Sequence, residues 1–190
     1  MGDDDRAAAP ACGATVPRLG APWEGSVAAR LTWNDVHLMG SALAGRVSGD
    51  GRPDILIAVL RGGMVPATVL AHALQLRDVR ALQIRHTIGE EIGAAKSTRP
   101  SVHHPGSLGN VSGRDVLIVD DVAGSGKTLE VARDLLAGLG AARTRTVALA
   151  VNRINWLRTH PDPPLDDPLR VLDYVGSFYA GWIICPWEIH

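Results

Sequence analysis

The segment of residues 116–128 constrains the fold of this chain more than any other. It reads Val-Leu-Ile-Val-Asp-Asp-Val-Ala-Gly-Ser-Gly-Lys-Thr, so an apolar run leads into two adjacent acids, a small-residue turn and the start of a helical pattern. A short, uninterrupted apolar run indicates a strand that is buried on both faces, as in a parallel sheet covered by helices. The segment therefore predicts a loop at the carboxyl end of a parallel strand, where open α/β sheets bind their ligands.

The turn within this segment has the chemistry of a phosphate site. Gly124 and Gly126 allow the backbone to turn tightly, so that consecutive N–H groups and the positive end of the following helix converge on one anion. Ser125 and Thr128 add hydroxyl donors. We therefore expect this loop to hold a phosphate group.

The acids Asp120 and Asp121 suit a sugar or a metal beside that phosphate. Ionised carboxylates only accept hydrogen bonds, so they match the 2- and 3-hydroxyls of a ribose or the water shell of Mg²⁺. The ending Gly-Lys-Thr also matches the end of a P-loop, but that motif requires a glycine at position 121, which is Asp. An ordinary turn between a strand and a helix remains the plainer alternative, and the acids before the turn argue against it.

The rest of the chain alternates between strand and helix patterns. Thr32 and Asp35 have the spacing of a capping box, which predicts a helix over residues 33–47. The later helices are expected over residues 67–76 and 127–139, and the strands over residues 55–60, 79–84, 116–120, 146–151 and 171–175. This alternation predicts an α/β fold with a central, mainly parallel sheet flanked by helices.

The length of 190 residues predicts a single domain. Residues 1–29 are rich in Ala, Gly and Pro, so we expect a flexible or irregular N-terminal segment before a domain that spans residues 30–190. Residues 86–114 lack periodicity over a length that is typical of a mobile lid or of a disordered excursion, and we favour the lid. The ending Gly-Trp-Ile-Ile-Cys-Pro-Trp-Glu at residues 181–188 is too irregular for a helix.

The composition excludes several classes of protein. The formal net charge of −1 and the hydrophobic content of 46% disfavour disorder and a nucleic-acid surface. Cys12 and Cys185 are too few for a disulfide framework or a Cys-x-x-Cys metal site. Since no apolar run is long enough to span a membrane, and acids stand where a signal peptide would be basic, we expect a cytoplasmic protein without a membrane or nucleic-acid partner.

The motif at residues 119–128 resembles the signature with which type I phosphoribosyltransferases bind phosphoribosyl pyrophosphate (PRPP). Leu60-Arg61-Gly62-Gly63, one strand–helix unit earlier, is similar to the pyrophosphate-binding loop of that family. The resemblance implies the type I phosphoribosyltransferase fold and a non-proline cis peptide between Leu60 and Arg61. It also implies catalytic roles for Arg61, Asp120 and Asp121, a Mg²⁺ cofactor at Asp121, and PRPP contacts from Leu60, Arg61, Gly62, Asp120, Asp121, Ala123, Gly124, Ser125, Gly126, Lys127 and Thr128.

Both ends of residues 30–190 resemble the bacterial xanthine, guanine and hypoxanthine branch of the family. The similarity lies in the early Trp-Asn-Asp-Val-His at residues 33–37 and in Trp-Ile-Ile-Cys-Pro-Trp-Glu at residues 182–188. In that branch a small C-terminal hood stacks an aromatic ring on the purine. The resemblance therefore implies a hood over about residues 170–190, with base contacts from Trp182 and Ile183. A stacked indole is physically reasonable, although Trp182 could instead only cover a hydrophobic edge.

Two positions depart from the pattern of this branch. Gly124 stands where the branch usually has an Asp that contacts the purine N7 and acts as general base. Asn152 matches a Lys that recognises the exocyclic oxygen, and an amide can either donate to an oxygen or accept from an amine. Arg153 could supply the cation instead, or form a surface salt bridge. The base is therefore an ordinary 6-oxopurine, a modified or deaza heterocycle, or one acidic enough to react without a protein base.

The expected activity is transfer of the 5-phosphoribosyl group from PRPP to a purine or purine-like nucleobase. Within the lid, Lys96 and Arg99 are candidates to steady the pyrophosphate, the alternative being a solvated loop. A PRPP-sensing regulator with little or no turnover is the rival function, and a nucleotide kinase is a weaker one. Members of the family commonly form dimers, so the resemblance implies a homodimer or a higher homo-oligomer.

Overall fold

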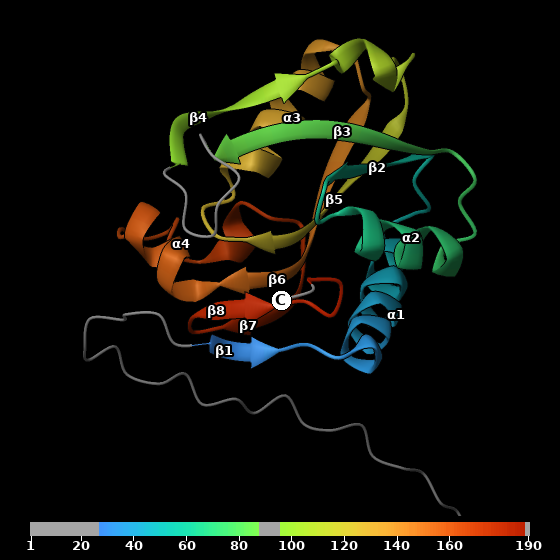
Figure 1. The fold of residues 1–190 in the computed structure, drawn as a ribbon. Helices are drawn as coiled ribbons and strands as arrows, with labels where there is room; N and C mark the ends of the chain where they lie inside the picture. Colours follow the sequence, from blue (N-terminus) through green and yellow to red (C-terminus); the bar gives the residue numbers. More distant parts are fainter. Residues whose placement is uncertain (1–26, 88–95, 189–190) are drawn as a thin grey trace, which may run out of the picture.

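The computed structural model describes residues 27–87 and 96–188, and its main sheet has six strands in the order β4-β3-β2-β5-β6-β7. All neighbouring strands run parallel except β3 and β4, which are antiparallel (Figure 1). The mainly parallel sheet predicted from the sequence is thus confirmed. The strands are β2 (Ile55–Leu60), β3 (Val79–Thr87), β4 (Lys96–His103), β5 (Asp115–Ala123), β6 (Arg143–Asn152) and β7 (Tyr174–Tyr179).

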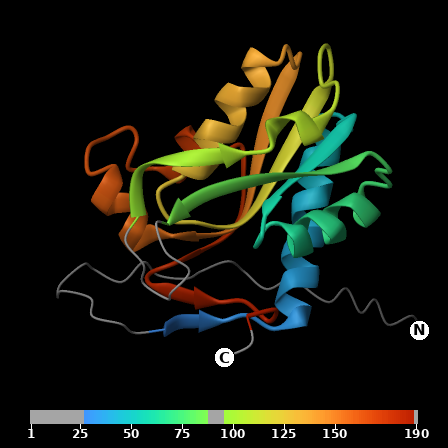
Figure 2. The same ribbon diagram turned by 45° about the horizontal axis from the view of Figure 1, so that its top comes forward.

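Helices cover both faces of this sheet, and each face has its own apolar cluster. α1 (Trp33–Gly49) and α2 (Met64–Ala73) pack on one face, and α3 (Lys127–Gly138) packs on the other (Figure 2). The capping box of α1 is present, since Asp35 N–H donates to the Thr32 hydroxyl and Thr32 N–H donates to the Asp35 carboxylate. None of the described helices is long and apolar enough to cross a membrane.

A second, two-stranded sheet forms the hood. β1 (Val27–Arg30) pairs in parallel with β8 (Trp182–Ile184), so the described chain begins and ends in the same small sheet. The sequence predicts irregular structure through residue 29, whereas β1 already begins at Val27. This short, alanine-containing strand carries no alternating pattern of its own, and its pairing with β8 gives it order.

The segment 86–114 also differs from the expected irregular lid. Residues 96–103 form β4 at the edge of the sheet, and Pro105–Leu108 form a 3₁₀ helix; residues 88–95 lie outside the described part of the chain. An edge strand needs no alternation of apolar and polar residues, and it tolerates a proline such as Pro100. The sequence of β4 therefore lacks the pattern by which strands are predicted. Two further elements have no counterpart among the predicted ones, namely α4 (Arg153–Thr159) and the 3₁₀ helix Pro168–Arg170.

Candidate active site

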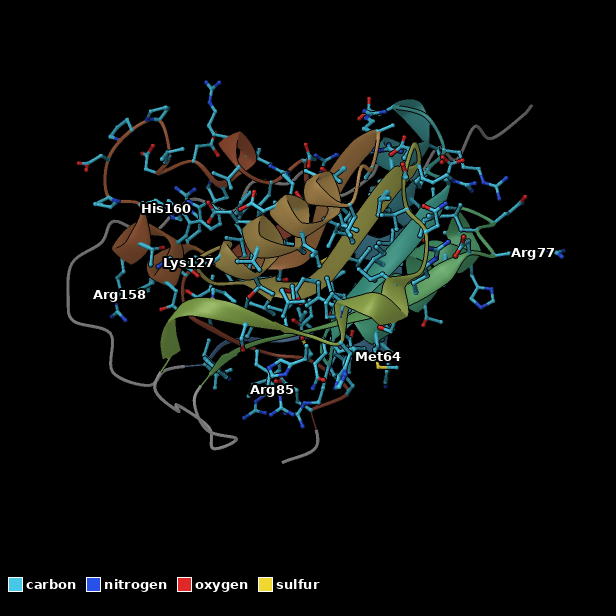
Figure 3. All side chains as sticks on the ribbon, turned by 90° about the horizontal axis from the view of Figure 1, so that it is seen from above. Met64, Arg77, Arg85, Lys127, Arg158 and His160 are labelled. Carbon is cyan, nitrogen blue, oxygen red and sulfur yellow. The ribbon has the colours of Figure 1, made fainter. Side chains whose placement is uncertain are left out.

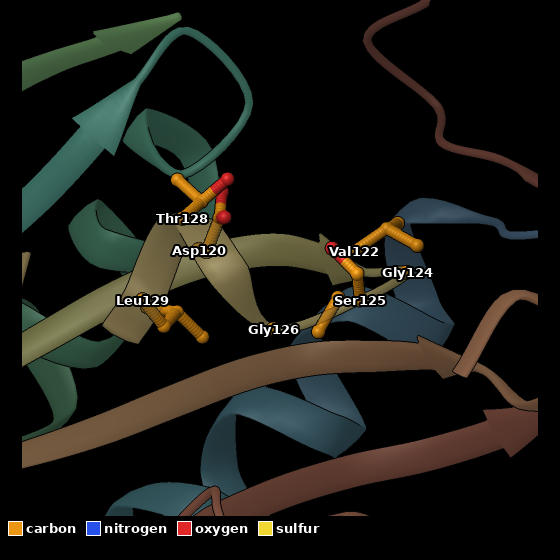
Figure 4. Close-up of a pocket in the computed structure, with 8 residues that line it drawn as sticks. Asp120, Val122, Gly124, Ser125, Gly126, Thr128 and Leu129 are labelled. Atoms are coloured by element: carbon orange, nitrogen blue, oxygen red, sulfur yellow. The ribbon is translucent and has the colours of Figure 1, made fainter. Parts of the chain in front are cut away.

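The loop between β5 and α3 encloses a cavity of about 130 Å³ (Figure 4). Predicted PRPP contacts form most of its wall. Asp121 and Lys127 are the exceptions within residues 120–128, since neither lines the cavity and Lys127 begins α3. The lining residues are Asp120, Val122, Ala123, Gly124, Ser125, Gly126, Thr128 and Leu129.

The amino end of α3 offers unpaired donors to this cavity. Gly126 precedes the helix with a φ of 70°, and no side chain caps the first turn. The first N–H groups of a helix have no partner within it, and the helix dipole places partial positive charge there. The loop can therefore bind a phosphate group as the cap that the protein itself does not supply.

Asp120 and Asp121 are held at the end of β5 by their own backbone. Asp121 N–H donates to Oδ1 of Asp120 at 3.0 Å, and Val122 N–H donates to Oδ1 of Asp121 at 2.6 Å. Burial raises the pKa of Asp120 well above its usual value, and the neighbouring charge of Asp121 adds to this rise. Burial also raises the pKa of Asp121. The pair is therefore electrostatically strained until a ligand brings donors or positive charge.

The predicted pyrophosphate loop lies against this acid pair. The peptide between Leu60 and Arg61 is cis, as predicted. A β-carbon on Gly62 would lie 1.8 Å from Oδ2 of Asp121, so only a glycine fits at this position without displacement. Arg61 is exposed at the same turn. Two loops that are about 60 residues apart in the chain thus meet at Gly62 and Asp121.

The hood places its two predicted base contacts differently. Trp182 is 42% exposed, as a stacking residue must be before it meets its ligand. Ile183 is 4% exposed and packs with Leu31 and Cys185, so its side chain belongs to the apolar centre of the hood. If Ile183 contacts a base, it does so through its backbone and not through its side chain.

The C-terminal end of the hood brings Glu188 toward the acids, a residue that the sequence did not single out. Oε2 of Glu188 accepts a hydrogen bond from Cys185 N–H at 2.8 Å. The charge of Glu188 contributes to the raised pKa of Asp121, after burial. Burial, with the charges of Asp121 and Glu188, raises the pKa of Cys185 to about 12, so this thiol stays protonated. No periodic signal marks Glu188, because folding alone brings residue 188 near residue 121.

Asn152 and Arg153 lie at the junction of β6 and α4. Asn152 is 3% exposed, and its Oδ1 accepts from Asn155 N–H at 3.1 Å as the cap of α4. Its Nδ2 makes no hydrogen bond to another described residue. Among the described residues this nitrogen is also not counted as a buried atom without a partner. The Arg153 guanidinium lies 5.9 Å from the centre of the Phe178 ring, and it forms no salt bridge within the described chain. The Nδ2 donors of Asn152 are thus free for a ligand, while its oxygen is engaged as the cap of α4.

The predicted lid cations Lys96 and Arg99 lie on β4. Their side chains fall outside the described part of the structure, so their contact with pyrophosphate stays a prediction.

Across residues 27–87 and 96–188, no three or more His, Cys, Asp or Glu side chains gather in a way that could hold a metal ion. A magnesium ion at Asp121 would accordingly take most of its oxygen ligands from substrate phosphates and water, which is how Mg²⁺ is usually bound at phosphate sites.

Comparison with known proteins agrees with this geometry. Residues 36–163 match the model of the phosphoribosyl transferase domain. A xanthine-guanine phosphoribosyltransferase from Ruegeria sp. (strain TM1040) is 30% identical over 167 residues, which are 84% of each chain. A protein of the same name from Roseobacter denitrificans (strain ATCC 33942 / OCh 114) is 34% identical over 166 residues, again 84% of each chain.

The fold has a similar solved structure as well. It superposes on the purine phosphoribosyltransferase from Pyrococcus horikoshii Ot3 with a TM-score of 0.66 and 30% identity, covering 86% of this chain and 96% of the other. The matched domain includes both loops of the site, from the cis peptide at Leu60 to Thr128. On this evidence the chain belongs to the phosphoribosyltransferase family.

Proposed function

We propose that the chain transfers the 5-phosphoribosyl group of PRPP to a ring nitrogen of a 6-oxopurine or a closely related base. The bond from ribose C1 to the pyrophosphate oxygen breaks, a bond from C1 to the ring nitrogen forms, and the nitrogen's proton leaves to solvent. The products are a nucleoside 5-monophosphate and pyrophosphate. The observation that carries this proposal is the contact between Gly62 and Asp121, which joins a pyrophosphate loop to a ribose and phosphate site.

Each part of PRPP has a place in this arrangement. The 5-phosphate enters the cavity at the amino end of α3, where backbone N–H groups and the hydroxyls of Ser125 and Thr128 face it. The ribose hydroxyls donate to the carboxylates of Asp120 and Asp121, which relieves part of their repulsion. The pyrophosphate lies on the loop of Arg61 and Gly62. The protein thereby holds C1 between its leaving group and the base.

We assign Mg²⁺ binding to Asp121, together with substrate oxygens. When bound, the ion neutralises charge that develops on the departing pyrophosphate. The acid pair suits such an ion, because burial and like charge raise both pKa values and a nearby cation lowers them again. Arg61, exposed beside the same loop, adds a fixed positive charge.

The base is assigned to the space under the hood. Trp182 offers an exposed indole for stacking on a flat ring. Asn152 turns its Nδ2 donors to the base, because its oxygen is engaged as the cap of α4, and a donor selects an exocyclic oxygen over an amine. A preference for an exocyclic oxygen agrees with the relatives that are named for xanthine and guanine, since both bases carry such an oxygen. Gly124 supplies no proton acceptor, so the ring nitrogen must lose its proton without help from that position.

We further propose a homodimer or higher homo-oligomer in the cytoplasm. Trp33, Leu38 and Met64 on α1 and α2 are all more than half exposed, at 58%, 59% and 53%, which is typical of residues that are covered by another subunit. The free thiol of Cys185 suits a reducing compartment. Size-exclusion chromatography with light scattering tests the assembly, and a monomeric mass would contradict it.

The experiment that tests the activity is a screen of bases with PRPP and Mg²⁺, read by pyrophosphate release. We expect release with guanine, xanthine or hypoxanthine, or with a deaza analogue, and little with adenine. An Asp120→Ala variant is the negative control. Absence of release with every base would contradict the proposed function.

A further inference from the structure

A buried tryptophan in α4 supports the phosphate loop from below. Trp156 is 0% exposed, and its six-membered ring touches the backbone of Gly126. A β-carbon on Gly126 would lie 2.8 Å from Cζ3 and 2.9 Å from Cη2 of this indole. Gly126 also has a φ of 70°, which side-chain-bearing residues rarely adopt. The backbone at the start of α3 therefore rests directly on the ring.

The indole itself is fixed on several sides. Its Nε1 donates to the carbonyl oxygen of Leu165 at 2.9 Å, and its ring stacks on the His160 imidazole with centroids 4.6 Å apart and planes inclined by 22°. It belongs to the same apolar cluster as Ala123 and Leu129, which line the phosphate cavity. The hydrogen bond and the stacked ring leave the indole one orientation, so the loop above it has a rigid base.

Trp156 is not one of the residues that line the cavity, so it can act on a ligand only through lining residues that it supports, and Gly126 is the one whose backbone lies against its ring. We propose that Trp156 is a positioning residue for PRPP: its indole sets the backbone of Gly126, and thereby aims the free N–H groups of α3 at the 5-phosphate. The proposal rests on the proposed function. Its physical reason is that no side chain caps α3, so packing beneath the loop must fix the direction of these donors.

The charges of α4 agree with this role. Arg158 near the end of α4 and His160 just after it lie on the same side of the molecule as Lys127 at the start of α3 (Figure 3). α4 contains two arginines and no acid, so it brings no negative charge toward the phosphate loop. An apolar contact that seats such a helix under an anion site adds favourable charge as well as rigidity.

The test uses Trp156→Phe, which keeps an aromatic ring but shortens it and removes the indole N–H. Isothermal titration calorimetry of the full chain with PRPP and Mg²⁺, without base, should show a Kd about tenfold higher than that of the wild type. In turnover assays the KM for PRPP should rise, while the KM for the base stays within about twofold. If Trp156 served stability alone, the variant would have a lower melting temperature, but its KM for PRPP would not rise relative to its KM for the base.

Leu136→Ala is the matched control. Leu136 is also 0% exposed and lies in the same cluster, about two turns further along α3 from the cavity residue Leu129. This variant should lose stability and keep the Kd for PRPP. If it weakens PRPP as much as Trp156→Phe does, general loosening of the cluster explains the effect and the proposal is overturned.

A double-mutant cycle with Gly126→Ala tests the contact itself. The added β-carbon strikes the indole in the wild type and less of the smaller ring in Trp156→Phe, so Gly126→Ala should cost less PRPP affinity in that background. Additive losses would overturn the proposal. If wild-type protein binds PRPP but uses no base, the proposed function fails and the cycle still decides the role of Trp156. If wild-type protein does not bind PRPP, both fail.

Discussion

Gly62 and Asp121 are in such close contact that a single added methyl group on Gly62 would overlap the Asp121 carboxylate, at 1.8 Å from Oδ2. Gly62 follows the cis peptide after β2, and Asp121 lies near the end of β5, the neighbouring parallel strand. The parallel register thus brings the loop that we assign to the leaving group against the acid that we assign to the ribose. In the proposed transfer the pyrophosphate and the ribose must keep a fixed separation at C1, and the contact between Gly62 and Asp121 sets the distance between the two loops that would hold them.

We therefore expect Gly62→Ala to reduce kcat/KM by about 100-fold or more, because the methyl group must push the Asp121 carboxylate or the loop out of place. Steady-state kinetics with saturating base measures this loss. Gly45→Ala is the control, since a β-carbon there meets nothing within 4 Å and Gly45 lies inside α1. It should raise stability by up to about 1 kcal/mol and leave activity unchanged. Wild-type activity in Gly62→Ala would show that the loop has room to move.

The sequence predicted the central sheet well and its margins poorly. The strand Ile55–Leu60 has the predicted bounds, because an unbroken apolar run of this length is buried on both sides as a central strand of the sheet. β1 and β8 are too short to show a period, and each is ordered only by the other. β4 is an edge strand, and its pairing with β3 decides its structure more than its own side chains do.

The site divides in the same way. The motif at residues 120–128 was readable because consecutive residues build one loop. Glu188 and Trp156 were not, because their roles depend on contacts across the fold, with Asp121 and Gly126 respectively. The predicted base contact of Asn152 stays a prediction, and its use as a helix cap depends on α4, which the sequence does not predict. Long-range contacts leave no local pattern to read.

The raised pKa of Asp120 predicts a conflict between stability and activity. A carboxyl group whose pKa is raised by folding stabilises the folded state below its unfolded value of 3.8, and that contribution is lost as pH rises through the folded pKa. Asp120→Asn has the same shape without the charge, so it should raise the melting temperature of the ligand-free protein at pH 7 by several degrees. It should also abolish most turnover, since a carboxylate facing the ribose is lost.

The pH dependence checks the cause of this gain. The difference in melting temperature between Asp120→Asn and wild type should shrink as pH falls from 7 toward 4, because both side chains are then neutral. Differential scanning fluorimetry across this range, without PRPP or Mg²⁺, measures it. Asp134→Asn on α3 serves as a comparison away from the acid pair. A stabilisation that stays constant with pH would mean that burial of charge is not the cause.

Asn152→Asp separates the cap from the donor at this position. Aspartate keeps an oxygen for the N–H of Asn155, so α4 should remain capped, while the new carboxylate at this 3% exposed position should lower the melting temperature at pH 7. The Nδ2 donors are lost, and a carboxylate repels an exocyclic oxygen but accepts from an amine. The ratio of kcat/KM for hypoxanthine over adenine should therefore fall by at least about tenfold. An unchanged ratio in a stable variant would remove Asn152 from base recognition.

Gly124→Asp tests what this loop lacks. Gly124 lines the phosphate cavity, and it is not among the glycines with positive φ, so its backbone accepts a side chain, unlike that of Gly126. A carboxylate there would accept a proton from the base, and such general base catalysis is worth roughly 10²–10⁴-fold where it is well placed. We expect higher kcat/KM with hypoxanthine or guanine, although part of that gain will be lost to imperfect placement.

Gly124→Asn, which has the same size and no basic oxygen, should not share the gain. Unchanged selectivity in Gly124→Asp would mean that the native base already reaches C1 in a reactive form, and that the missing acid reflects the substrate and not a lost function.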